Sequence, residues 1–352
     1  MFEWADGGNL RDLWQRTDVD CAELNGDRIM KVLEQLLGLA EALSKLHNKA
    51  NHNKNPTGTP ERLARAETLL ASPADNVPKI QIQADNESNG DTRKTGEEHW
   101  RHGDLKPDNI LLFKDAASPW LGTLKIADLG LAKQHEFATS QRVDPTRQVY
   151  STSQYEAPEV VTKPLDPRSR LYDIWSMGCI ILEFVIWLLY GHAGLRNFYN
   201  EKPKALASRD TLYFTLKHQG RLAEVSDIVK RWMEHMLQFD PECSGESPSV
   251  LRDLIRLVKD HLLVVDLPGE GLVSKNCRGD ADFLENSLRS IMLRAKVDAG
   301  GSYLFTQSSR KAVQTPKEMS SLSTGPVGKA VASKSPNLYV SFMPYHHPRH
   351  FG

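Results

Sequence analysis

The sequence predicts an α+β fold that is mainly helical, with a few short strands gathered in one part of the chain. Apolar residues recur at helical spacing over residues 27–47, and a long, nearly continuous apolar run covers residues 171–190. Between them, residues 110–113 and 124–127 are short apolar runs separated by a loop with proline and glycine, as expected of two strands. The 352-residue chain is long enough to bury a sizeable core.

Composition narrows the class of protein. The net charge of -1 gives no global attraction to nucleic acid or to a membrane surface, and 40% hydrophobic residues are ordinary for a globular protein. The four cysteines are scattered without CxxC spacing, which argues against a zinc site or a disulfide framework and suits a reducing compartment. The first residues do not resemble a signal peptide. We therefore expect an intracellular protein, cytoplasmic or nuclear.

The first predicted helix covers residues 27–47, with Asp27 as its expected N-cap. The periodic pattern stops after this helix. Residues 49–98 contain no Phe, Tyr or Trp and are rich in Asn, Thr, Pro, Glu and Lys. A stretch of this length and polarity is typical of a disordered insertion.

The apolar run at residues 171–190 is long enough to suggest a membrane span, but it contains the acidic residues Asp173 and Glu183. Charged side chains within a span are costly, so a buried core helix is the better interpretation and no membrane span is expected. Further helical patterns follow over residues 228–237, 251–262 and 281–297.

Three short motifs carry the chemistry, and they follow one another in the chain. Residues 102–109 read HGDLKPDN, residues 128–130 read DLG after a predicted strand, and residues 157–159 read APE. Phosphoryl transfer needs an aimed hydroxyl and neutralised phosphate charge, which a protein supplies mainly by positioning and electrostatics. Asp104 can accept a hydroxyl proton, and Asn109 and Asp128 offer the hard oxygen ligands that magnesium prefers.

Each of these residues alone has a simpler interpretation. An aspartate in a loop is usually a turn residue or a helix cap, DLG is a common tripeptide, and His102 alone is more often a core histidine. Their order and their strand–loop–strand setting together argue against coincidence.

In this arrangement the chain resembles the C-terminal lobe of the eukaryotic protein kinase family. Residues 102–112 resemble the HRDxKxxN catalytic loop, and residues 128–130 resemble the DFG motif. Residues 155–159 resemble the APE end of the activation segment, and residues 173–178 resemble the DxWSxG start of a long buried helix. The resemblance covers residues 1–265 apart from the insertion at 49–98. Two parts lie beyond it: an extension with a helix over 266–299, and a basic, Ser/Thr-rich disordered tail over 300–352.

The resemblance implies a protein kinase fold and a Ser/Thr kinase that transfers the γ-phosphate of ATP to protein hydroxyls with Mg²⁺. Asp104 would be the catalytic base, and Lys106 would steady the transferring phosphate. Lysine at this position is typical of Ser/Thr kinases. Asn109 and Asp128 would bind magnesium.

Four other residues would take supporting roles by the same resemblance. Leu111 would lie under the adenine ring, and Thr152 would help to form the substrate-docking surface. Asp173 would anchor the backbone of the catalytic loop from inside the core. Glu159 would anchor the end of the activation segment.

The chain departs from the family pattern in two places near these motifs. Gly103 stands where most members have an arginine that pairs with a phosphate on the activation segment, so we expect activity to depend little on such phosphorylation. The arginine that usually pairs with Glu159 is missing after Asp240-Pro241, and Arg252 or Arg256 is the expected substitute.

The largest departure concerns the start of the chain. Residues 1–10 resemble the hinge between the two kinase lobes, so backbone groups of Glu3 and Ala5 would meet adenine and Asn9 would approach the ribose. The chain contains neither a GxGxxG loop nor a VAIK-type lysine. We expect from this that the N-terminal lobe is absent, that the sequence is truncated, and that this chain alone binds ATP weakly.

Two alternatives remain open on the sequence alone. A catalytically inactive kinase-like lobe could act as a binding or scaffold module. The HGD tripeptide also occurs in aminoglycoside and choline phosphotransferases, which leaves a small-molecule phosphotransferase as a minor alternative. Lys106 and the motifs at residues 155–159 and 173–178 are unusual in that class.

Overall fold

A computed structural model describes residues 5–16, 23–48, 99–116, 118–129, 133–135, 153–202, 212–268, 277–298, 301–306 and 315. The expected insertion at residues 49–98 lies outside the described residues, and so do Glu3, Thr152 and all of the expected tail except 301–306 and 315.

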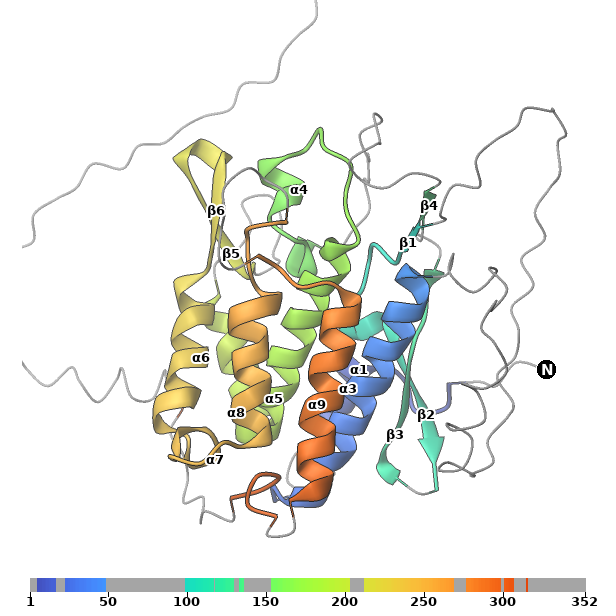
Figure 1. Cartoon of the computed structure of the whole chain (residues 1–352), viewed down its shortest axis with the longest axis vertical. Helices are drawn as coiled ribbons and strands as arrows, with labels where there is room; N and C mark the ends of the chain where they lie inside the picture. Colours follow the sequence, from blue (N-terminus) through green and yellow to red (C-terminus); the bar gives the residue numbers. More distant parts are fainter. Residues whose placement is uncertain are drawn as a thin grey trace, which may run out of the picture.

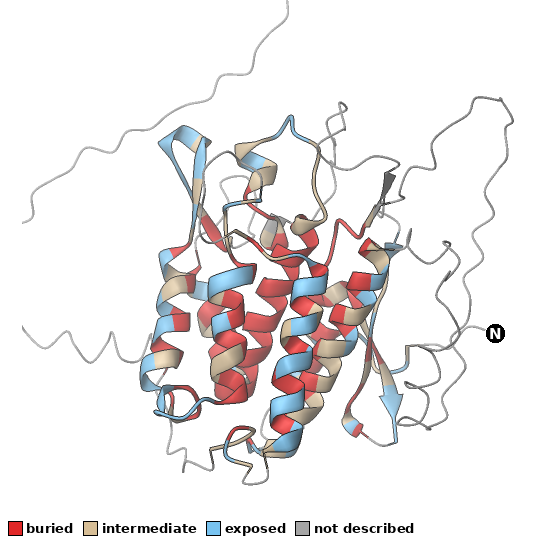
Figure 2. Ribbon diagram, in the orientation of Figure 1, coloured by how far each residue is buried: buried red, intermediate tan, exposed pale blue. Residues whose placement is uncertain are grey.

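Helix α5 (Leu171–Glu201) runs through the middle of the molecule (Figure 1). It is longer than the run predicted from the sequence because the helix resumes after a kink at Gly191, whose φ of 65° suits glycine. By length and composition α5 could cross a membrane, but 89% of its apolar window is buried inside the protein. Figure 2 shows this helix as an almost continuous band of buried residues, so the prediction of a core helix is confirmed.

Helix α3 (Gly26–His47) begins one residue earlier than expected, and its N-cap is Asn25 rather than Asp27. Asn25 has extended backbone geometry, and its side-chain oxygen accepts the main-chain N–H of Arg28 at 3.0 Å. Helix α9 (Ala281–Val297), which coincides with the pattern seen in the sequence, packs along α3 (Figure 1).

The remaining helices are all shorter than α3, α5 and α9 (Figure 1). They are α1 (Leu10–Gln15), α4 (Glu159–Thr162), α6 (Asp227–Phe239), α7 (Pro241–Ser244) and α8 (Val250–Leu257), which continues into the π-helical turn η7 (Val258–Leu262). Among the described residues the buried side chains form one core around α5. The mainly helical α+β class is confirmed.

Strands β2 (Ile110–Asp115) and β3 (Ser118–Ile126) form an antiparallel pair in which Ile110 lies opposite Ile126. The pair extends further toward its turn than the apolar pattern predicted, because exposed ladder residues need no apolar side chain. The segment before α1 joins β2, since the Gly7 N–H donates to the Leu112 carbonyl at 3.0 Å and the Leu112 N–H to that of Gly8 at 2.9 Å.

Two other antiparallel pairs were not predicted. Strand β1 (His99–Arg101) pairs with β4 (Lys133–His135), and β5 (Phe214–Lys217) pairs with β6 (Leu222–Val225). These strands have three or four residues each, which is too short for an alternating pattern to stand out.

A cluster of polar side chains is buried beside α5. Glu183 is fully buried and accepts hydrogen bonds from the hydroxyls of Tyr155 and Tyr213. Lys202 at the end of α5 places its Nζ 4.0 Å from Glu183 Oε1. Burial raises the pKa of Glu183, and burial lowers the pKa of Lys202 to about 8 although Glu183 opposes this shift.

This cluster predicts a pH dependence of stability. The pKa of Lys202 falls from its usual 10.5 to about 8 on folding, so between these values the unfolded chain binds more protons than the folded one. The free energy of unfolding, measured by urea titration, should therefore rise relative to that of a Lys202→Met variant by about 1–2 kcal/mol between about pH 7.5 and about pH 9.5. Parallel curves for the two proteins would contradict this assignment.

Candidate active site

The loop at residues 102–109 is held by a carboxylate from the core. Asp173, fully buried in the first turn of α5, accepts the main-chain N–H of His102 at 2.8 Å and that of Gly103 at 2.9 Å. His47 Nε2 at the end of α3 lies 2.9 Å from Asp173 Oδ2. Burial alone would raise the pKa of Asp173, but the hydrogen bond and charge of His47 and the Gly103 N–H lower it overall. Asp173 thus stays an anion that can hold both amides.

The backbone at Gly103 favours a glycine. Its φ is 82°, a region that residues with a Cβ adopt only at a cost of about 1 kcal/mol or more. A contact of the preceding residue also fixes the loop, since His102 Nε2 lies 2.8 Å from the carbonyl oxygen of Ala127, which follows β3. The residue that departs from the family pattern is therefore matched to the conformation of this loop.

Asp104, Lys106 and Asn109 come together within the loop. Lys106 Nζ lies 2.6 Å from Asp104 Oδ2, and Asn109 Nδ2 donates to the Asp104 carbonyl oxygen at 2.9 Å and to Oδ2 at 3.2 Å. Asp104 and Asn109 are both 8% exposed. The carboxylate of Asp104 is thus oriented by two donors from its own loop, and Pro107–Asn109 form the short 3-10 helix η2 that presents Asn109.

Asp128 lies just beyond β3 and is exposed, with a φ of 60°. The neighbouring Ala127 N–H donates to the Asn109 carbonyl at 2.9 Å, which ties the backbones at these two positions together. Asn109 Nδ2 donates to Asp104, so the side-chain oxygen of Asn109 is the atom that remains for a metal. In the part of the chain that the structure describes, no three His, Cys, Asp or Glu side chains gather for a metal. Two hard oxygen donors nevertheless fit Mg²⁺, which binds through few protein ligands and keeps waters and phosphate oxygens.

The segment expected to face ATP lies beside β2. Ala5 and Leu111 are half-buried, and Asn9 forms an isolated bridge with Leu111. The side chain of Asn9 caps α1, since its Oδ1 accepts the Asp12 N–H at 3.0 Å while the Asn9 N–H donates to the Asp12 carboxylate at 3.1 Å. This capping box was not predicted, and it occupies the side-chain oxygen of Asn9, the residue expected to approach a ribose.

Arg11 on α1 was missed altogether by the sequence analysis. Its Nε donates to Asp108 Oδ1 at 2.9 Å and its Nη2 to Asp108 Oδ2 at 2.8 Å, and Nη2 also lies 3.3 Å from the Tyr155 hydroxyl. Burial alone would lower the pKa of Arg11 and raise that of Asp108, but their mutual hydrogen bonds reverse both shifts. The two residues lie 97 positions apart, so no local sequence pattern indicates that they form a pair.

The expected partner of Glu159 was wrong. Arg278, fully buried, donates Nη1 and Nη2 to the two carboxylate oxygens of Glu159 at 2.8 and 3.0 Å, and it lies over the ring of Trp175. Arg252 instead donates to the Gly245 carbonyl, and Arg256 is exposed. Arg278 lies 119 positions from Glu159 and just ahead of α9, so its place beside Glu159 follows from the packing of the helices and has no local signal.

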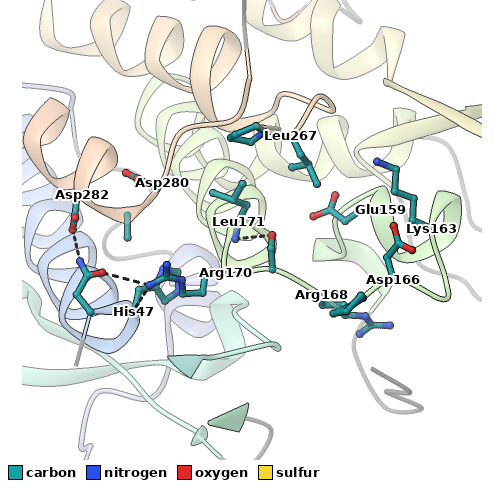
Figure 3. A pocket seen from close by; sticks show the side chains of 15 residues that line it. His47, Glu159, Lys163, Asp166, Arg168, Arg170, Leu171, Leu267, Asp280 and Asp282 are labelled. Atoms are coloured by element: carbon teal, nitrogen blue, oxygen red, sulfur yellow. Dashed lines mark hydrogen bonds between the residues drawn. The ribbon is translucent and has the colours of Figure 1, made fainter. Parts of the chain in front are cut away.

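A cavity of about 550 Å³ lies beside this pair (Figure 3). Its wall includes His47, Glu159, Arg170 and Asp282, from the end of α3 and the starts of α4, α5 and α9. None of the residues predicted to act on phosphate or metal lines it. The cavity is therefore separate from the loop that carries Asp104.

The ion pair of Glu159 and Arg278 predicts a large stability effect. Arg278→Met should lower the free energy of unfolding by about 3 kcal/mol, because it leaves a nearly buried carboxylate without its cation. Arg256→Met is the matched control and should change that free energy by less than about 0.5 kcal/mol, since Arg256 is exposed. Urea titration of both variants measures the difference, and equal losses would contradict the importance of the pair.

Comparison with known proteins agrees with this geometry. Residues 97–244 match the family model of the protein kinase domain. Ribosomal protein S6 kinase alpha-6 of Danio rerio is 31% identical over 152 residues, which are 43% of this chain and 19% of that protein. Serine/threonine-protein kinase RAD53 of Saccharomyces cerevisiae is 32% identical over 157 residues, which are 40% of this chain and 16% of that kinase.

A third relative, a probable cell division protein kinase of Encephalitozoon cuniculi, is 42% identical over 84 residues, 24% of this chain and 28% of the relative. The chain thus spans less than a third of the length of each of these three relatives. The matched segment contains the HGDLKPDN, DLG and APE motifs. On the motifs, their arrangement and these comparisons, residues 97–244 match the eukaryotic protein kinase family.

Proposed function

We propose that this chain supplies the catalytic loop of a Ser/Thr protein kinase, which transfers the γ-phosphate of ATP to hydroxyls of a protein substrate. The observation that carries the proposal is the arrangement of Asp104, Lys106 and Asn109 on a loop whose backbone is bound to Asp173. This arrangement provides a base, a cation and an amide oxygen on one rigid element, as phosphoryl transfer requires.

Each residue has a defined task in this proposal. The Asp104 carboxylate accepts the proton of the acceptor hydroxyl as that oxygen attacks the terminal phosphorus. The Nζ atom of Lys106 lies 2.6 Å from Asp104 Oδ2, where its charge can balance that of the transferring phosphate. The Asn109 side-chain oxygen and the Asp128 carboxylate would hold Mg²⁺, which when bound neutralises the phosphate oxygens.

Three observations support a protein Ser/Thr acceptor over a small molecule. Lys106 is the residue typical of Ser/Thr kinases in this loop, and the relatives named above are protein kinases. The anchored residues 155–159 also offer a surface next to the loop, since the Tyr155 hydroxyl bonds to Glu183 and Glu159 pairs with Arg278. Adenine would meet the backbone near Ala5 and the side chain of Leu111 on β2, since the segment that follows Ala5 is bonded to β2 through Gly7 and Gly8.

The proposal is tested on the full-length protein by phosphate transfer from radiolabelled ATP to a Ser/Thr protein substrate. Asp104→Asn keeps the size of the side chain but removes the base, so the transfer rate should fall by at least about a hundredfold. ATP affinity in the presence of magnesium should stay within about threefold, because Asp104 contacts the acceptor rather than the nucleotide.

The matched control is Asp260→Asn, an exposed aspartate on η7 far along the chain from the catalytic loop. Its transfer rate should equal that of the wild type. Full transfer by the Asp104→Asn variant, with normal folding, would refute the assigned base.

A further inference from the structure

The guanidinium group of Arg11 joins three segments that lie far apart in the sequence. It contacts Asp108 in the catalytic loop and Tyr155 just before the APE motif, from its own position on α1. Building on the proposed function, we propose that Arg11 is a positioning residue, which holds the catalytic loop in register with the segment at residues 153–159.

The contact with Asp108 fixes direction as well as distance. Nε and Nη2 meet the two carboxylate oxygens at 2.9 and 2.8 Å, which is the parallel, two-bond arrangement that restrains both planes. The side chains of Arg11 and Asp108 are 27% and 41% exposed, so the pair lies at the edge of the core, where water weakens the attraction. The ion pair should therefore contribute more to the orientation of the loop than to the stability of the protein.

Asp108 transmits this orientation to the base. It is the middle residue of the short helix η2, and its neighbour Asn109 donates to both the carbonyl and the carboxylate of Asp104. The main-chain N–H of Asn109 also donates to the Lys106 carbonyl at 2.9 Å. A rotation of η2 would therefore move the Asp104 carboxylate, the Lys106 backbone and the proposed metal ligand together.

The other contact of Arg11 reaches a rigid point. The ring of Tyr155 is buried, its hydroxyl donates to Glu183 at 2.9 Å, and its carbonyl accepts the Ser176 hydroxyl at 2.9 Å. Both partners belong to α5. Through Tyr155, Arg11 is thus connected to the same core helix that carries Asp173.

Helix α1, which carries Arg11, is itself held in place. Helix α1 is closed at its N-terminus by the capping box of Asn9 and Asp12, and it buries Leu10, Leu13 and Trp14. Loss of the Arg11 charge should therefore leave α1 in place and release only the loop. Arg11→Met is suited to test this, because it keeps an unbranched side chain of similar length.

The test compares amide hydrogen exchange in the full chain for the wild type, Arg11→Met and Arg11→Lys. In Arg11→Met, amides of residues 104–109 and 153–157 should exchange about tenfold faster, while those of α5 keep their wild-type rates. Arg11→Lys should be intermediate, since lysine keeps the charge but cannot form both bonds at once. Arg289→Met is the control, because Arg289 also bridges two acidic partners, Glu41 and Glu285, at a partly exposed site away from the loop.

Kinetics of the full-length protein provide the second readout. The kcat of Arg11→Met and of Asp108→Asn should each fall about tenfold, with no larger loss in the double variant, because both break one contact. Arg289→Met should leave kcat unchanged.

The outcomes separate this inference from the proposed function. Faster exchange confined to the two segments would support the role of Arg11 even if the wild type transferred no phosphate, in which case only the proposed function fails. Unchanged exchange in Arg11→Met, or an increase spread evenly over the chain, would overturn the inference. Additive losses of kcat in the double variant would also overturn it.

Discussion

The carboxylate of Asp173 is the point on which the candidate active site depends. It is fully buried on the central helix α5, yet it accepts two main-chain N–H groups from the catalytic loop and a side-chain contact from His47. A buried carboxylate is costly unless it is paired and hydrogen-bonded, and here it is met by two N–H groups of the loop and by His47 at the end of α3. The hydrophobic core around α5 therefore determines where the loop lies.

Two further ion pairs extend this arrangement outward from α5. Glu159 and Arg278 hold the end of the APE motif against the start of α9, and Arg11 and Asp108 hold α1 against the catalytic loop. The first pair is nearly buried and the second is partly exposed, so the first should contribute mainly to stability and the second mainly to geometry. In both cases an arginine meets a carboxylate through two bonds, which restrains the orientation of the joined segments.

Much of this architecture could be predicted from the sequence, and each part that could not has a physical reason. An amphipathic pattern predicted α3 and a long apolar run predicted the core of α5. The motif order identified Asp104, Lys106 and Asn109, which the structure brings into contact. The misplaced N-cap at Asp27 reflects two polar residues that both suit a helix start, of which the backbone selects Asn25. Arg278 and Arg11 were missed because their partners lie about a hundred positions away, and such contacts follow only from packing.

Hydrogen exchange at the His102 and Gly103 amides tests the role of Asp173 most directly. In an Asp173→Asn variant, a neutral side chain replaces the carboxylate, so one amide loses its acceptor and the other keeps a weaker one. Both amides should then exchange at least about tenfold faster than in the wild type, while amides in the middle of α5 keep their protection. Unchanged protection at both positions would contradict the claim that Asp173 holds the catalytic loop.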